Sequence, residues 1–135
     1  MFRLLYISTS RAPIDDAMLT DILTVSRRNN ARDGITGLLV VGGTRFLQML
    51  EGEESAVRAA YERIAKDPRH FACVTLEAHS VERREFAQWA MGAVTLDDPA
   101  GLAELHKRIE GVEDRNLRAQ FDSFVRQHGG GRAAA

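Results

Sequence analysis

Hydrophobic and polar residues alternate along the chain with two periods, and each period predicts a type of element. A period of two predicts strands over residues 2–8, 35–41, 44–51, 70–78 and 86–94. A helical period predicts long helices over about 15–30 and 53–67, and shorter ones over 102–109 and 114–128. Gly42 and Gly43 predict a hairpin turn, and Asp33-Gly34 and Pro68 end the long helices.

The resulting order is β-α-β-β-α-β-β followed by two short helices, which indicates an α+β protein. The first six elements match the ferredoxin-like arrangement. We expect a five-stranded mixed sheet with the two long helices on one face. The other face carries apolar side chains such as Leu5 and Met49, so it needs the two C-terminal helices as a cover. This predicts a core over 1–94, a helical cap over 95–128 and a disordered tail over 129–135.

Several polar side chains occupy positions where the same periodicity predicts the core. Ser26 and Asn30 lie on the apolar stripe of the first helix, with Asn29 at its edge. Gln48 and Tyr6 share strand faces with apolar residues, and they could bond to each other if their strands are neighbours. Burying an unpaired amide costs about 1–3 kcal/mol. The set would suit a flat, polar-edged ring between two helices.

Each of these residues also has a purely structural explanation. Gln48 can be satisfied by backbone groups, and Tyr6 can be a core aromatic residue with a local partner for its hydroxyl. Ser26 can bond back to its own helix, and Asn30 can cap the helix end.

Two further pairs are ambiguous in the same way. Arg63 and Asp67 are spaced i,i+4 at the flank of the second helix, which favours a surface ion pair worth under about 1 kcal/mol. Trp89 and Met91 share one face of the last predicted strand, where core packing is the default. A tryptophan near a redox ring can instead donate an electron, and a methionine can act as a mobile packing element.

Composition and charge narrow the classes of function. The net charge of −1, without a basic stripe, argues against a nucleic-acid partner. No apolar run approaches the roughly 20 residues that span a bilayer, and the start of the chain lacks a signal peptide. A single cysteine, Cys73, suggests a reducing, cytoplasmic setting. Phosphate-cradle motifs, metal-ligand spacing and catalytic triads are absent, so neither a metal nor an enzyme is expected.

Five segments, taken in order, resemble the BLUF domain, a family of blue-light sensors that use FAD. They are LLYIS, SRRNNARDGITGLLVV, FLQMLEGEESAV, YERIAKDPRH and FAQWAMG, and they cover about residues 2–94. The motifs NNxxxGITG, FxQxLEG and RIxxDxRH are specific in combination. The resemblance implies FAD bound non-covalently, with its isoalloxazine ring between the two long helices.

The resemblance also implies roles for individual residues. Tyr6 matches the photoactive tyrosine, Gln48 the switching glutamine and Asn30 the asparagine that bonds the carbonyl edge of the ring. Arg63 matches an arginine that contacts the flavin, against the surface position that periodicity favours. Ala90 departs from the family, because many members have a serine there. The remaining matches to positions near the flavin or in the mobile last strand are Ser26, Asn29, Asp67, Arg69, His70, Trp89 and Met91.

In the mechanism that the resemblance implies, Tyr6 gives an electron and then a proton to the excited flavin. Recombination leaves Gln48 rotated or tautomerised, and the absorption shifts to the red. With only two helices after residue 94, we expect a stand-alone photosensor that signals to an unknown protein in trans or through self-association as a homo-oligomer. One alternative is a ferredoxin-like regulatory module that binds a small metabolite without photochemistry. Another is an acylphosphatase-type hydrolase, which would need a phosphate-binding loop that is missing here.

Overall fold

A computed structural model describes residues 1–129, and its element order confirms the predicted one. The elements are β1 (Phe2–Ser10), α1 (Asp16–Asp33), β2 (Thr36–Gly42), β3 (Arg45–Gly52), α2 (Glu54–Ala65), β4 (His70–Ser80), β5 (Gly92–Thr95), α3 (Pro99–Ile109) and α4 (Arg115–His128). Of the tail expected to be disordered, residues 130–135 lie outside the described residues. Gly129 closes α4, since its N–H donates to the Val125 carbonyl at 2.8 Å.

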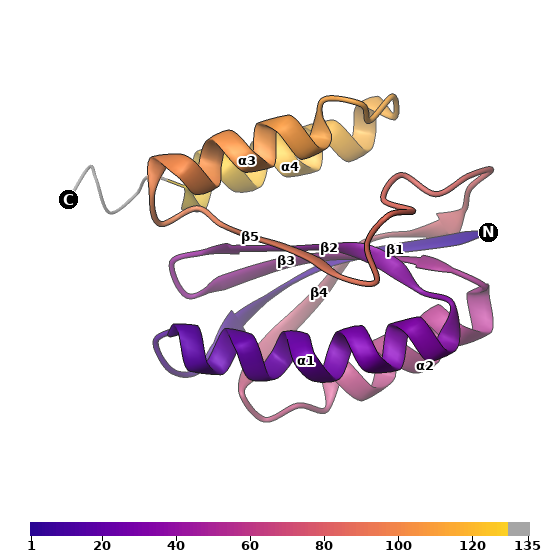
Figure 1. The fold of residues 1–135 in the computed structure, drawn as a ribbon, viewed down its shortest axis with the longest axis horizontal. Helices are drawn as coiled ribbons and strands as arrows, with labels where there is room; N and C mark the ends of the chain where they lie inside the picture. The colour runs from indigo at the N-terminus through magenta and orange to yellow at the C-terminus, as the bar shows by residue number, and fades with distance from the viewer. Residues whose placement is uncertain (130–135) are drawn as a thin grey trace.

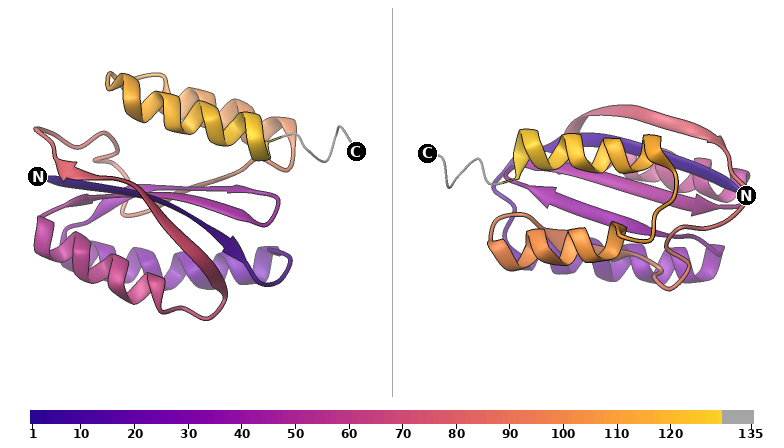
Figure 2. Two further views of the ribbon diagram at one scale, coloured as in Figure 1. Left: turned by 180° about the vertical axis from the view of Figure 1, so that it is seen from behind. Right: turned by 90° about the horizontal axis from the view of Figure 1, so that it is seen from above.

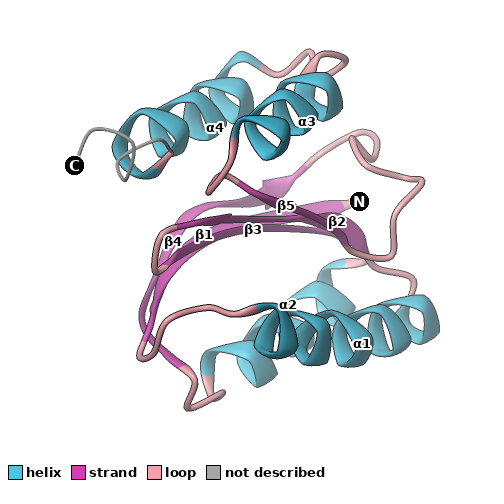
Figure 3. Cartoon of the chain, turned by 60° about the vertical axis from the view of Figure 1, so that its left-hand side comes forward, coloured by secondary structure: helices cyan, strands magenta, loops and turns pink. Residues whose placement is uncertain are grey.

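The five strands form one mixed sheet in the order β4-β1-β3-β2-β5. Neighbouring strands are antiparallel except for β5, which runs parallel to β2. Helices α1 and α2 cover one face and α3 and α4 the other, as Figure 1 shows. Figure 3 shows the three layers in side view. This is the predicted ferredoxin-like α+β fold, with the fifth strand added beside β2.

The alternation along the central strands divides the apolar side chains between two cores. In β1, Phe2 and Tyr6 face α1 and α2, whereas Leu5 faces the lid helices, our name for α3 and α4. In β3, Leu50 faces α1 and α2, and Met49 faces the lid helices. Each face of the sheet therefore has its own buried layer, as the period of two predicts.

Glycines set both ends of β2. At its start, Gly34 ends α1 with a φ of 70°. At its far end, Gly42 still pairs with Arg45, and the turn consists of Gly43 and Thr44, one residue later than predicted. Gly43 has a φ of 63°, a left-handed conformation that glycine adopts without steric cost.

The prediction of a strand over 86–94 is wrong for most of its length. Only Gly92–Thr95 is a strand, and the residues before it form turns. The reason is that backbone groups of this segment bond within a local turn or to side chains, instead of to a neighbouring strand. Trp89 N–H donates to the Phe86 carbonyl at 3.1 Å, and Asn30 Nδ2 donates to the Ala90 carbonyl at 2.7 Å. Trp89 and Met91 consequently do not share a face. Met91 is buried on the α1 and α2 side, and Trp89 packs on the side of the lid helices.

Strand β4 is an irregular edge strand. Its pairing with β1 shifts register twice, and Ala72 has a φ of 56°, which is unusual for a residue with a side chain. Phe71 and Val74 are exposed on it. Seen from above, β4 runs outside the area that the lid helices cover (Figure 2). The opposite edge is β5, which has four residues.

Candidate functional site

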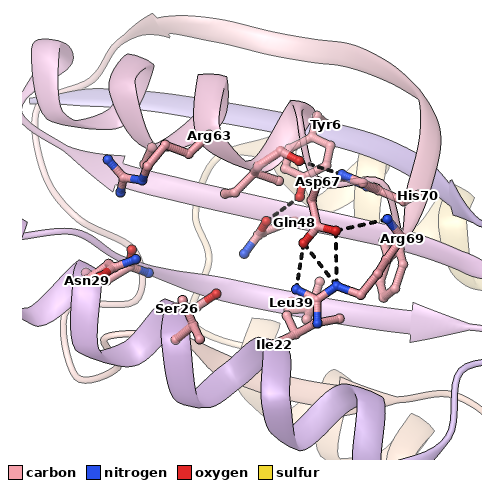
Figure 4. A pocket seen from close by; sticks show the side chains of 15 residues that line it. Tyr6, Ile22, Ser26, Asn29, Leu39, Gln48, Arg63, Asp67, Arg69 and His70 are labelled. Atoms are coloured by element: carbon pink, nitrogen blue, oxygen red, sulfur yellow. Dashed lines mark hydrogen bonds and ion pairs between the residues drawn. The ribbon is translucent and has the colours of Figure 1, made fainter.

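A pocket lies between α1 and α2 over the central strands. Its volume of about 220 Å³ is several times the roughly 30 Å³ that one water occupies in the liquid. Leu39 of β2 and Ala60 of α2 supply part of its apolar lining (Figure 4). All nine residues predicted to contact a cofactor line it: Tyr6, Ser26, Asn29, Asn30, Gln48, Arg63, Asp67, Arg69 and His70.

Tyr6 and Gln48 are cross-strand partners of β1 and β3, and the hydrogen bond expected between them is present. The Tyr6 hydroxyl donates to Gln48 Oε1, and both side chains are buried. Burial raises the pKa of Tyr6 well above its ordinary value, so the phenol keeps its proton. Gln48 Nε2 lies 3.4 Å from the Met91 sulfur, which is a weak acceptor. The amide donor of Gln48 therefore has capacity for a stronger acceptor in the pocket.

Asn30 is buried, but it does not cap its helix as one interpretation suggested. Helix α1 continues to Asp33, and Gly34 is its cap. The Asn30 amide instead donates to the Ala90 carbonyl. One turn earlier, Arg27 Nε donates to the Met91 carbonyl at 2.9 Å. No sequence pattern indicates this contact of Arg27, because its partner is a backbone group far away in the chain.

Arg63 and Asp67 do not form the i,i+4 pair that their spacing favours. Helix α2 ends at Ala65, so Asp67 lies beyond it. The Arg63 guanidinium is 3.6 Å from Asp33, at the C-terminal end of α1. In Figure 4 it reaches over one end of the pocket, with Arg69 at the other. Arg63 is 47% exposed, which agrees with the flank position that periodicity predicts. Periodicity could not show that the pocket lies beside this flank of the helix.

Asp67 and Arg69 form the other end of the pocket. Asp67 accepts hydrogen bonds from the backbone N–H and the guanidinium of Arg69. These bonds lower the pKa of Asp67 from its ordinary value, so the carboxylate is charged at neutral pH. Arg69 also lies 2.8 Å from Asp21 of α1. These ion pairs thus connect α1 to the segment that follows α2.

His70 is buried at the start of β4 and bonded through both ring nitrogens. Nε2 is 2.6 Å from the Ile64 carbonyl, which can only accept, so Nε2 donates. Nδ1 lies 2.7 Å from the Ser8 hydroxyl. These two contacts hold the His70 ring in place at the pocket wall. Within residues 1–129, no three His, Cys, Asp or Glu side chains come together in a way that could ligate a metal.

Fold and site together define a ferredoxin-like module whose pocket suits a flat ligand with a polar edge. Its apolar lining can cover the faces of a ring, and the amides of Gln48, Asn29 and Asn30 can meet the edge. The family model of sensors of blue-light using FAD matches residues 1–92, and the chain belongs to this BLUF family. It is therefore a flavin-binding, blue-light-sensing domain.

Individual relatives agree with this assignment. The chain is 32% identical over 104 residues to the blue light- and temperature-regulated antirepressor BluF of Escherichia coli (strain K12), covering 77% of this chain and 23% of that protein. The dark-state structure of BlrB, a BLUF protein, is 32% identical with a TM-score of 0.69, covering 80% of this chain and 93% of that one. Klebsiella pneumoniae BlrP1 with FMN and cyclic diGMP is 31% identical with a TM-score of 0.77, covering 92% and 34%.

This chain spans less than a quarter of the antirepressor's length, so the antirepressor's activity as a whole does not follow from the match. Among residues 1–129, none of the helices combines the length and hydropathy that a bilayer crossing requires.

Proposed function

We propose that the flavin is FAD, bound non-covalently by the nine predicted residues that line the pocket. The observation that carries this proposal is the buried pair of Tyr6 and Gln48, whose amide donor has only the Met91 sulfur within hydrogen-bonding distance among the described residues. Asn30 and Asn29 would meet the polar edge of the ring, and Arg63 and Arg69 would lie at its two ends. The family description names FAD, whereas one related structure contains FMN.

The bound flavin would supply absorption of blue light and an oxidising excited state. Tyr6 is the residue of this pocket that can then release an electron followed by its hydroxyl proton. That proton already points at Gln48 Oε1, so the amide is the first group to receive it. When the electron and the proton return, Tyr6 is restored and Gln48 is left rotated or tautomerised. The changed amide would alter the hydrogen bonds at the ring edge and shift the absorption to the red.

Replacing Tyr6 by Phe tests this assignment. Y6F keeps the aromatic ring and loses the hydroxyl, so we expect flavin binding to remain and the light-induced red shift to disappear. The measurement is the light-minus-dark absorption spectrum of the purified protein loaded with FAD. Tyr61 offers a matched control, because its ring centroid lies 5.0 Å from that of Tyr6 and its hydroxyl is bonded to Thr75 instead of Gln48.

The Tyr61→Phe variant should shift like the wild type. A normal red shift in Y6F would remove Tyr6 from the mechanism. A wild-type protein that takes up no flavin would favour the metabolite-binding alternative instead.

We further propose that residues 1–94 are the sensor core and residues 95–128 a cap that passes the signal to a protein in trans or to a second copy, in the cytoplasm. The family match to residues 1–92 supports the first part. The packing of Trp89 against the side of the lid helices supports the second.

A further inference from the structure

Glu51 is a fully buried carboxylate that no step of the proposed photochemistry uses. It has 0% exposure and lies on β3, three residues after Gln48 and on the face toward the lid helices. A buried charge is costly unless it is paired or well hydrogen-bonded. The partners of this side chain therefore indicate what it does.

Two of those partners are backbone groups of residues 84–91, here called the linking segment. The backbone N–H groups of Glu85 and Phe86 donate to the two Glu51 oxygens at 2.7 Å each. The Thr36 hydroxyl donates to Oε1 at 3.0 Å. Hydrogen bonds to an ionised acceptor are stronger than those between neutral groups. Arg84 adds to the same anchor, because its guanidinium donates to the Glu51 carbonyl at 3.1 Å.

The other end of the linking segment is held by the pocket and by β2. Asn30 holds the Ala90 carbonyl, Arg27 the Met91 carbonyl, and Gln48 contacts the Met91 sulfur. The Trp89 carbonyl accepts from the backbone N–H of Gly37 at 3.1 Å. A change in the amide of Gln48 or in the bonds of Asn30 would therefore act on this end.

Trp89 belongs to the second of these anchored ends through its backbone, and its side chain faces the lid helices. Its ring centroid is 5.8 Å from that of Phe86, and the Arg108 guanidinium of α3 stands 4.5 Å over the ring. This cation–π contact connects the linking segment directly to a lid helix. How Trp89 moves then depends on which parts of the segment stay fixed.

We propose that Glu51 is a positioning residue that fixes the start of the linking segment, so that a change at Met91 moves Trp89 relative to Arg108. Without this anchor the whole linking segment would shift when Met91 changes. Trp89 would then not change its position relative to Arg108 of α3. The inference rests on the proposed function, and it concerns the transfer of the signal and not its generation. Glu51 should therefore affect the response of Trp89 while leaving the response of the flavin intact.

Trp89 is the only tryptophan of the chain, which makes it a specific reporter. With 5-fluorotryptophan incorporated, fluorine NMR gives one signal that can be recorded in the dark and under blue light, beside the flavin absorption spectrum. In Glu51→Gln, one carboxylate oxygen becomes an amide that faces an N–H donor. We expect this variant to keep the red shift and to lose most of the light-induced change in the fluorine signal.

Glu82→Gln is the matched control, because it removes the same charge from an exposed position just before the linking segment. It should retain both responses. Arg84→Gln weakens the anchor from its outer side and leaves the buried carboxylate in place, so it covers the case in which Glu51→Gln does not fold. We expect it to reduce the fluorine response with the red shift retained.

A full fluorine response in Glu51→Gln, or in Arg84→Gln if the first variant does not fold, would overturn the inference and leave the proposed function standing. A wild-type protein that shows no red shift would overturn the proposed function, and the inference with it.

Discussion

Gly37 occupies a position in β2 where the structure leaves no room for a side chain. A Cβ atom there would lie 1.9 Å from the Met49 carbonyl oxygen and 3.3 Å from the terminal methyl of Met91. Its backbone N–H also holds the Trp89 carbonyl. A glycine inside a strand is typical of such a close approach, and here the approaching group is the backbone of β3.

Gly37→Ala should consequently destabilise the fold. We expect a loss of about 1–3 kcal/mol or more, the range for overpacking a filled core, because the clash is with backbone and not with the end of a flexible side chain. Urea unfolding measures the change. Gly111→Ala is the control, since a Cβ at Gly111 meets nothing within 4 Å. Equal stability of the two variants would contradict the steric explanation.

Single residues also show where prediction from the sequence succeeds. Tyr6 and Gln48 could be paired in advance, because a period of two fixes the face of each strand and the fold makes the strands neighbours. Glu51 and Arg27 could not be assigned. Their partners are backbone groups of an irregular segment far along the chain. The hydrophobic periodicity of a strand or helix does not predict such contacts.

At the scale of elements, one strand was predicted too long. Residues 86–94 carry the apolar pattern of a buried strand, but pattern alone does not show where the backbone finds its hydrogen bonds. Here Glu51 takes two N–H groups and Asn30 takes a carbonyl. The helices were easier to predict, since capping residues such as Asp98 and Asp114 are local signals.

Helix α4 is tied to the sheet by charge as well as by apolar contact. Asp114 caps the helix by accepting from the backbone of Asn116 at 2.9 Å, and its other oxygen lies 2.5 Å from the guanidinium of Arg3 in β1. Arg3 is 2% exposed and also pairs with Glu77 of β4 at 3.1 Å. A cap residue thus connects the N-terminus of a lid helix to the opposite side of the sheet from the pocket.

This contact should make the docking of α4 depend on pH. The bond to Arg3 lowers the pKa of Asp114 below its ordinary value, which is about 3.9. The stabilisation is therefore complete above about pH 4 and is lost as the pH falls through the lowered pKa. Asp114→Asn keeps a good cap but lacks the charge, so it should be less stable than the wild type at neutral pH.

The measurement is urea unfolding of both proteins across the acidic range. The difference in unfolding free energy should shrink as the pH falls and the wild-type carboxyl becomes neutral. A difference that is the same at neutral and strongly acidic pH would show that the charge of Asp114 does not matter.

At the scale of the whole molecule, the ferredoxin-like fold class followed from the order of elements, because that order and the two-sided strands leave few ways to bury both faces of the sheet. The sheet then separates two cores that have different tasks in the proposed function. One surrounds the pocket, and the other joins the sheet to the lid helices. The linking segment contributes Met91 to the first and Trp89 to the second.

Flavin binding should stabilise the whole chain, since only the folded state has the pocket. At a free concentration about 100 times the dissociation constant, a ligand adds about 2.7 kcal/mol. The residues at the pocket favour contacts to the ring, so FAD, FMN and riboflavin should each raise the melting temperature, whereas ADP, which lacks the ring, should not. Thermal unfolding with each ligand measures this. Stabilisation by ADP and FAD without any by riboflavin would place the main contacts on the dinucleotide.

The irregular course of β4 has a consequence for assembly. An exposed strand edge can recruit a strand from another molecule, and bulges, charges or short length prevent this. Here one edge is bent by two register shifts and the conformation of Ala72, and the other offers only the four residues of β5. We therefore expect two copies that meet in solution to associate through faces of the molecule, because both edges disfavour the addition of a strand from a second copy.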